Sequence, residues 1–261
     1  MTNIELTTST WHTTVTLPVG LEDVDTGTVL REVTLRKMTG NEEAALADPK
    51  LRRNGGKLVT ALIAGCARDA DGKPLRAERV RKLTSADRNF LLLELRRLTF
   101  GDLMEAQYTC PRCGAVTRVE EDLAELPVAT TEDGASDGDI ELRLNDGYRD
   151  PNGEIHYDLT FRLPTGEDEE AAHALRDENP ARQRDALITR CLLRVGELEP
   201  RRIRALGVRL LADLSMSDRR LIGRRFDEAV PGPNLTRTVT CDHCGEDSRQ
   251  TLDMSHFFDL E

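Results

Sequence analysis

The chain repeats itself, and this repeat is the feature that most limits how it can fold. The segment that begins at Gly20 matches the segment that begins at Gly147, and further matches follow in the same order. The offset between matched positions stays between 125 and 131 residues. The matched positions include Thr39-Gly40 with Thr165-Gly166, Cys66 with Cys191, Asp87-Arg88 with Asp218-Arg219, and Thr109-Cys110 with Thr240-Cys241. This period far exceeds the ~20–50 residues of solenoid repeats, so we predict a tandem duplication of a small domain.

The boundary between the two copies is predicted in residues 128–139, VATTEDGASDGD. This stretch is rich in Thr, Asp and Gly and has few large apolar residues, which is typical of a flexible acidic linker. The expected organisation is therefore a flexible tail (1–14), a first copy (15–127), the linker (128–139) and a second copy (140–261).

Each copy shows the same order of local patterns. A β-hairpin comes first and a short helix follows, with capping-box spacing at Thr39 and Glu42 and again at Thr165 and Asp168. A buried helix is expected next (57–68 and 181–194). A longer amphipathic helix then begins near Ser85 or Ser215, and in the first copy we expect it to extend through Leu103 and Met104. A cysteine pair between two strand-like segments ends each copy, so the predicted fold class is α+β.

Both cysteine pairs have the form Cys-x-x-Cys-Gly, at Cys110 and Cys113 and at Cys241 and Cys244. Two intervening residues allow both thiolates to reach one tetrahedral ion, and the glycine permits the tight turn that follows. A structural zinc site takes four ligands, whereas one pair supplies two. We therefore predict one structural Zn²⁺ held by all four cysteines, which joins the two copies.

Other interpretations of these pairs remain. A redox pair of the thioredoxin kind would lie at a helix start, whereas strand-like residues flank these pairs on both sides. Separate sites completed by His243 or His256, or by a second chain, are a second alternative. Four thiolates leave zinc no open position, which favours a structural site over a catalytic one. Cys66 and Cys191 lie on apolar helical faces and are expected to be core residues.

Composition excludes several classes of protein. No apolar run reaches the ~18 residues of a membrane span, and Met1 to Thr14 lacks the pattern of a secretory signal. We therefore expect a reducing compartment, where metal binding is favoured over disulfides. The net charge of −11 argues against a protein that coats nucleic acid. We find no Walker loop, no Rossmann glycine pattern and no hydrolase or zinc-protease motif, and the five histidines show no pairing.

Residues 17–54 resemble the opening of small proteins encoded with contractile phage tails and related contractile injection systems. Those proteins are the T4-type baseplate proteins or baseplate hub assembly chaperones. The shared pattern is listed here as it stands in this sequence: Leu17 to Gly20, Asp25 to Gly27, Arg31-Glu32, Leu35-Arg36, Thr39-Gly40, Glu42-Glu43 and Asp48-Pro49. The resemblance extends over about residues 15–105 and recurs more faintly in 140–230. The duplication and the cysteine pairs depart from the usual small member.

The resemblance implies a protein without enzymatic activity that builds or nucleates the baseplate hub. Its expected partners are hub, spike or tube proteins of a contractile particle, in the bacterial cytoplasm during assembly. It leaves open whether the protein stays in the finished particle. The alternative from another class is a zinc-ribbon adaptor that binds nucleic acid, although the net charge and the scarcity of aromatic residues near the cysteines argue against it. A third class, a metalloenzyme, would need an open coordination position.

Overall fold

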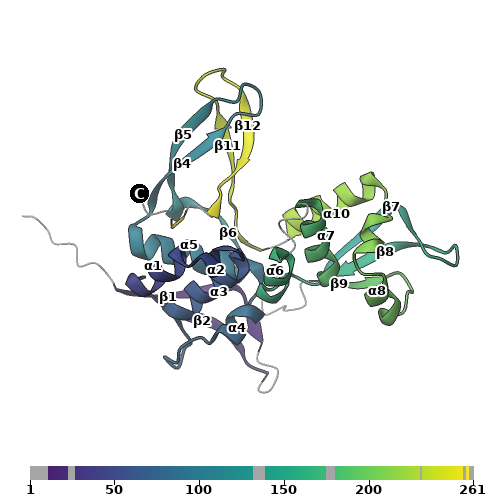
Figure 1. Ribbon diagram of the computed structural model, residues 1–261, viewed down its shortest axis with the longest axis horizontal. Coiled ribbons are helices and arrows are strands. Elements are labelled where there is room, and N and C mark those ends of the chain that lie inside the picture. Colours follow the sequence, from purple (N-terminus) through teal and green to yellow (C-terminus); the bar gives the residue numbers. More distant parts are fainter. Residues whose placement is uncertain are drawn as a thin grey trace, which may run out of the picture.

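The computed structural model describes residues 11–22, 27–131, 139–174, 180–229, 231–254 and 257–258. It confirms the α+β class, because helices are combined with sheets whose strands pair antiparallel. Two lobes lie side by side and a long arm of strands projects from the first of them (Figure 1). Most of the expected tail and linker (1–10 and 132–138) and His256 lie outside the described residues.

The first lobe combines a small sheet with five helices. The sheet is antiparallel with the order β1-β2-β3. Its strands are β1 (His12–Glu22), β2 (Val29–Arg36) and β3 (Ala67–Arg68). The helices are α1 (Gly40–Ala47), α2 (Pro49–Arg52), α3 (Gly55–Cys66), α4 (Ala77–Lys82) and α5 (Ser85–Phe100).

The second lobe also combines helices with an antiparallel sheet, whose strand order is β7-β8-β9. Its strands are β7 (Ile140–Arg149), β8 (Ile155–Phe161) and β9 (Leu192–Val195). Its helices are α6 (Gly166–His173), α7 (Pro180–Cys191), α8 (Pro200–Leu206), α9 (Val208–Ala212) and α10 (Met216–Ala229).

Two β-hairpins, one from each half of the chain, form the projecting arm (Figure 1). The first hairpin pairs β4 (Leu103–Thr109) with β5 (Val116–Asp122), and the second pairs β11 (Thr236–Thr240) with β12 (Asp247–Thr251). A 3₁₀ turn, η1 (Leu123–Glu125), follows β5. At the base of the arm, the short strands β6 (Val128–Ala129) and β10 (Gly232–Pro233) pair with each other.

The capping boxes expected at α1 and α6 are both present. In α1 the Glu42 carboxylate accepts from the Thr39 backbone N–H at 2.9 Å and binds the Arg36 guanidinium. In α6 Asp168 does the same with Thr165 and Arg162. The same arginines also donate to a backbone carbonyl of the buried helix in each lobe. Arg36 donates to Gly65 of α3, and Arg162 donates to Arg190 of α7. Each box therefore ties a short helix to both the sheet and the helix behind it.

A buried aspartate holds a bulge in the first strand of each sheet. The pairing register of β1 shifts between Thr16 and Leu21, and that of β7 shifts between Arg143 and Tyr148. The Asp87 carboxylate accepts backbone N–H groups of the first bulge, and the Asp218 carboxylate accepts those of the second. The donors are Val19 and Gly20 for Asp87, and Asn145, Asp146 and Gly147 for Asp218. Backbone N–H groups that have no partner in the strand pairing at each bulge thus donate to a buried carboxylate.

Some expected boundaries were wrong. The buried helices end at Cys66 and Cys191, and the residues after them form the third strands, β3 and β9. The long helix α5 ends at Phe100, because Gly101 adopts φ 93°, a conformation that favours glycine. Leu103 and Met104 are consequently in β4 rather than in the helix. At the N-terminal end, β1 begins at His12, within the segment expected to be a tail.

The two hydrophobic cores do not follow the order of the chain. Side chains near the C-terminus pack into the first core, and two side chains of the first half pack into the second core. The former are Val239, Leu252, Phe257 and Phe258, and the latter are Val19 and Ala86. Neither core is therefore complete without residues from both halves.

The lobes meet where the first turn of α6 rests on α3, α4 and the start of α5. Arg88 lies at this contact, and its side chain is completely buried. Its Nε donates to Glu169 at 3.0 Å, and its Nη atoms donate to Thr60 Oγ1 and to the Gly56 carbonyl. Gly166 lies directly against the guanidinium, where even a Cβ atom would be 2.7 Å from Arg88 Cζ.

Candidate metal centre

The tip of each arm hairpin is a tight turn that presents two cysteines. Gly114 donates to the Cys110 carbonyl and Gly245 donates to the Cys241 carbonyl, both at 2.9 Å. The two glycines have φ values of 73° and 69°, which an L side chain rarely adopts. The sequence pattern Cys-x-x-Cys-Gly therefore fixes the turn as well as the ligands.

The structure brings all four predicted cysteines of the arm together. The Sγ atoms of Cys110, Cys113, Cys241 and Cys244 all lie within 4.8 Å of one another. The Cys110–Cys244 and Cys113–Cys241 Sγ distances are each 3.7 Å, and both cross from one hairpin to the other. A tetrahedral ion with sulfur ligands at ~2.3 Å needs sulfur–sulfur distances of about 3.8 Å. The sulfurs thus fit a zinc ion that both hairpins would share.

Backbone N–H groups point at the sulfurs, as expected for turns that hold thiolates. The N–H groups of Cys244 and His243 lower the pKa of the Cys241 thiol to about 6. Hydrogen bonds from amides favour the charged form of a thiol, and the thiolate is the form that binds a metal. The turn after Cys241 consequently stabilises the thiolate of this cysteine, whereas the neighbouring sulfurs raise the pKa of Cys244.

Side chains and backbone groups also join the two hairpins below the cysteines. Arg112 forms an ion pair with Glu246 at 2.8 Å, and the Asp242 N–H donates to Thr117 Oγ1 at 3.2 Å. Further down, Arg237 of β11 pairs with Glu121 of β5, which also accepts from the Tyr108 hydroxyl. The arm is therefore one unit built from segments more than 100 residues apart.

The other two cysteines do not belong to this centre. Cys66 and Cys191 are buried in the first and second cores, as the sequence predicted. Burial raises the pKa of each thiol to about 12. His256, considered above as an additional ligand, lies outside the described residues.

Asp150, Glu154 and His156 form a second group of potential ligands at the β7–β8 turn. The Asp150 carboxylate already accepts the backbone N–H groups of Asn152 and Glu154 through Oδ1. The Arg202 guanidinium lies 3.6 Å from its other oxygen. An arginine beside the carboxylate disfavours a cation there, so we interpret this group as the stabiliser of a turn.

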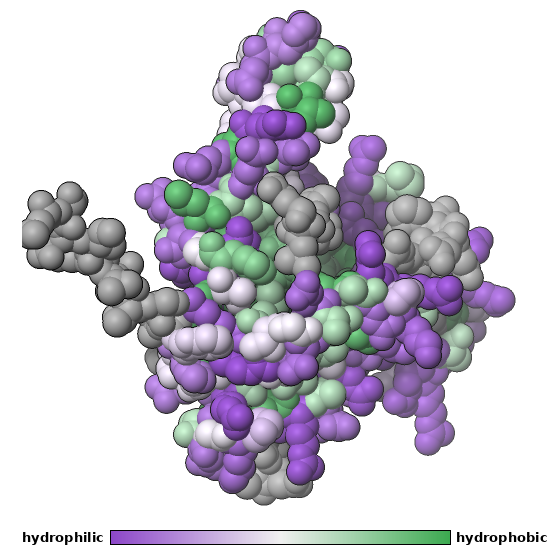
Figure 2. Space-filling model, turned by 60° about the vertical axis from the view of Figure 1, so that its left-hand side comes forward, coloured by the Kyte–Doolittle hydropathy of each residue, from purple (hydrophilic) through white to green (hydrophobic). Residues whose placement is uncertain are grey.

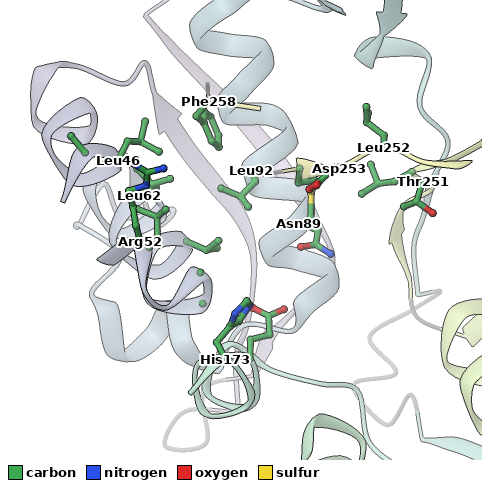
Figure 3. Close-up of a pocket in the computed structure, with 18 of the residues that line it drawn as sticks. Leu46, Arg52, Leu62, Asn89, Leu92, His173, Thr251, Leu252, Asp253 and Phe258 are labelled. Carbon is green, nitrogen blue, oxygen red and sulfur yellow. The ribbon is translucent and has the colours of Figure 1, made fainter. Parts of the chain in front are cut away.

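A groove of about 1070 Å³ lies beside the contact between the lobes. Figure 3 shows His173 of α6 at one end of this groove and Phe258 at the other, with Leu62 and Leu92 between them. Its walls come from α1, α3, α5, α6 and the segment after β12. Nothing in the local sequence pattern signals this groove, because it forms only when both halves and the C-terminal segment pack together.

The arm is the most prominent surface feature of the molecule. Figure 2 shows it as a projection with a hydrophobic patch near its tip on a mainly hydrophilic surface. Val116, at the start of β5 beside the cysteine turn, is 56% exposed.

A family model described as T4 bacteriophage base plate protein matches residues 8–259. The chain belongs to this family. The match includes both lobes, both cysteine pairs and the arm, whereas the resemblance found in the sequence extended over two shorter segments. Searches of curated proteins and of solved structures found no significant match.

Membership in the base plate family supports a component of a phage base plate that contacts other base plate proteins. Among the described helices, none has the length and apolar content needed to cross a bilayer. The four-cysteine cluster is compatible with a metal site within this family member.

Proposed function

We propose that this chain is a non-enzymatic component or hub assembly factor of the base plate of a contractile, phage tail-like particle. The match over residues 8–259 is the observation that carries this assignment. Its partners would be hub, spike or tube proteins, bound during assembly in the bacterial cytoplasm. The two lobes present related but different faces, which suits an adaptor between two partners.

We further propose that a structural Zn²⁺ stabilises this adaptor. The sulfur separations of 3.7 Å between hairpins support a single shared ion. Zinc with four thiolates has no open position, so its contribution would be to hold the two hairpins together. Because β11 and β12 also bring Val239 and Leu252 to the first core, the ion would stabilise the lobe below the arm as well.

The proposed origin is a tandem duplication, with copies at 15–127 and 140–261. Matched contacts in the two lobes support this origin in addition to the matched residues of the sequence. The three-stranded sheets have the same order, the capping boxes bind the same arginine position, and Asp87 and Asp218 hold equivalent bulges. Such long-range contacts would be an unusual coincidence in unrelated halves.

The base plate assignment is tested in a strain that produces the particle. The gene is deleted and particles are isolated by gradient centrifugation, and a tagged copy is expressed in parallel to locate the protein by immunoblot. We expect the deletion to remove complete, contractile particles. We also expect the tagged protein in particles or in assembly intermediates. Normal particles from the deletion strain, with the protein absent from both fractions, would show that the assignment is wrong.

The shared zinc is tested by metal analysis of purified variants. We expect about one zinc per wild-type chain, and loss of nearly all zinc from both Cys113→Ser and Cys244→Ser. Cys66→Ala is the matched control, since it removes a buried core thiol and should retain the ion. If each arm variant kept half of the zinc of a two-zinc wild type, the hairpins would hold separate sites.

A further inference from the structure

The contact between the two lobes has a counterpart that no described residue of this chain fills. Within the chain, the first turn of α6 packs on a surface that we call the first docking site. This site consists of Gly56, Thr60, Val80, Leu83 to Ser85 and Arg88. Two backbone hydrogen bonds anchor α6 there, from Gly166 N–H to the Leu83 carbonyl and from Ser85 N–H to the Pro164 carbonyl. Glu169 then receives the Arg88 Nε, as described above.

The second lobe carries an equivalent surface, which we call the second docking site. Arg219 occupies the position of Arg88, and its Nη1 donates to the Leu211 carbonyl as Arg88 Nη1 donates to the Val80 carbonyl. Its Nη2 binds Asp185, which stands where the first lobe has Thr60. A cavity of about 360 Å³ lies at this place. Its lining is Ala181, Arg184, Asp185, Ile188, Leu211, Arg219, Arg220 and Ile222.

Two details indicate that no described helix occupies the second docking site as α6 occupies the first. No described residue accepts from Arg219 Nε, the atom that in Arg88 binds Glu169. Met216 is 68% exposed, whereas Ser85 at the same position of the first lobe is 9% exposed. A large exposed apolar side chain three residues from Arg219 is typical of a contact surface.

Helix α1 has the features of α6 but makes no equivalent contact. Gly40 corresponds to Gly166 and Glu43 corresponds to Glu169, and Glu43 is exposed with no ion pair to a described residue. Nothing lies within 4 Å of a Cβ built on Gly40. Its backbone does not have the positive φ that would require glycine. Glycine weakens a helix relative to alanine, so no described contact within the chain explains why position 40 is a glycine.

One further pair of positions differs between the docking sites and between the helices α6 and α1 in a complementary way. In the internal contact, Thr60 donates to the Glu170 carboxylate at 2.7 Å. The second docking site has Asp185 in place of Thr60, and a glutamate facing it would be repelled. Helix α1 has Ala44 in place of Glu170, which removes that repulsion. Helix α1 therefore fits the second docking site better than α6 would.

The second docking site differs in one respect that shifts the docked helix. Ala181 replaces Gly56, where a Cβ would lie 2.8 Å from the Glu170 N atom. A docked helix must therefore lie slightly further out than α6 does at the Ala44 end, one turn away from Gly40. Arg220 replaces Asn89 at this rim and is exposed, so it extends the cationic surface toward the carboxylate of the shifted helix.

We propose that α1 of one chain docks on the second docking site of another copy of the chain, repeating between chains the contact that joins the lobes within one. Figure 1 places α1 and the α7–α10 region at opposite sides of the molecule, so one chain cannot make this contact with itself. The contact is head-to-tail, and it either closes a ring or continues along a filament. It depends neither on the zinc nor on the base plate assignment, and it adds self-association to the proposed function.

Sedimentation velocity of the zinc-loaded protein tests the contact over a range of concentrations, up to about 1 mM, the weak end of specific binding. We expect the wild type to associate with increasing concentration. Gly40→Ala should leave the fold intact and abolish association, because its Cβ would meet the Arg219 guanidinium. Arg220→Glu should also abolish association, whereas Arg204→Glu on α8, the same charge change outside the site, should not.

Mixing two variants gives the decisive result. Gly40→Ala keeps an intact second docking site and Arg220→Glu keeps an intact α1, so an equimolar mixture should form a 1:1 dimer that does not grow further. The proposal is overturned if the wild type stays monomeric at all concentrations. It is equally overturned if Gly40→Ala associates as the wild type does, or if the two variants fail to pair although the wild type associates.

Discussion

Replacing Gly166 by alanine adds a single methyl group at the contact between the lobes. The new Cβ would be 2.7 Å from Arg88 Cζ and 3.0 Å from Arg88 Nε, against ~3.5–4.0 Å for an ordinary contact. Arg88 cannot move aside, because its completely buried guanidinium is held by Thr60, Gly56 and Glu169. Helix α6 must therefore move outward.

The magnitude follows from what this movement disturbs. Overpacking of a buried contact costs about 1–3 kcal/mol. Weakening the two backbone hydrogen bonds that anchor α6 adds about 1 kcal/mol each. The gain from alanine in a helix offsets less than about 1 kcal/mol. We expect a loss of about 3 kcal/mol in the free energy of unfolding, which lowers the melting temperature of a chain of this size by about 6–12 °C.

Gly40→Ala is the matched control, because it makes the same change at the same helical position with nothing within 4 Å of the new Cβ. In dilute solution its melting temperature should equal or slightly exceed that of the wild type. The measurement is thermal unfolding of both zinc-loaded variants, followed by circular dichroism. Equal melting temperatures for Gly166→Ala and the wild type would refute the reasoning, as would equal losses in both variants.

Three further predictions concern the thiols, the arm and the capping box. With zinc removed by a chelator, the four thiols in the turns at the tip of the arm should react with a maleimide in the folded protein. Cys66 and Cys191 lie inside the two hydrophobic cores and should react only on unfolding, so six reactive thiols in the folded chelated protein would contradict this. Cys241→Ser should increase proteolysis of the arm and lower the melting temperature more than Gly166→Ala does, since structural zinc contributes on the order of 10 kcal/mol of binding energy; an unchanged melting temperature would contradict this. Burial alone would raise the pKa of Asp168, but the Arg162 and Thr165 hydrogen bonds outweigh it and hold the pKa at about 2, below the ordinary 3.8. Asp168 thus stabilises the fold above pH 3.8, and that stabilisation is lost as the pH falls toward 2. The free energy of unfolding of Asp168→Asn at neutral pH should therefore be lower than that of the wild type by roughly 1–2 kcal/mol, after solvent screening of its exposed arginine partners. Between pH 3.8 and 2, the urea midpoint of this variant should change less than that of the wild type.

The cysteine turns of the candidate metal centre could be predicted because their geometry is local. Cys-x-x-Cys-Gly between strand-like segments specifies a hairpin turn with two aligned sulfurs, and the structure has two such turns facing each other. The capping boxes at Thr39 and Thr165 were predictable for the same reason, since all their partners lie within three residues.

The features that were missed depend on residues far apart in the chain. The third strands after Cys66 and Cys191 are short, and they are strands only because β2 and β8 lie beside them. Arg88 looked like an ordinary polar residue of a helix, and its burial depends on Glu169, 81 residues away. The matched Asp-Arg pairs in both halves were the one signal that could have pointed to it.

The return of the C-terminal segment to the first core bears on the order in which the chain can acquire its structure. During synthesis, the helices and strands of the first half emerge early, but Val239, Leu252, Phe257 and Phe258 emerge only after the second lobe. Until then the first lobe exposes apolar side chains of its own core and half of its cysteine ligands. Contacts that span so much of the chain are slow to form, and incompletely covered cores are prone to aggregation. The second lobe, which needs Val19 and Ala86 from the part already synthesised, is the lobe that can finish its core first.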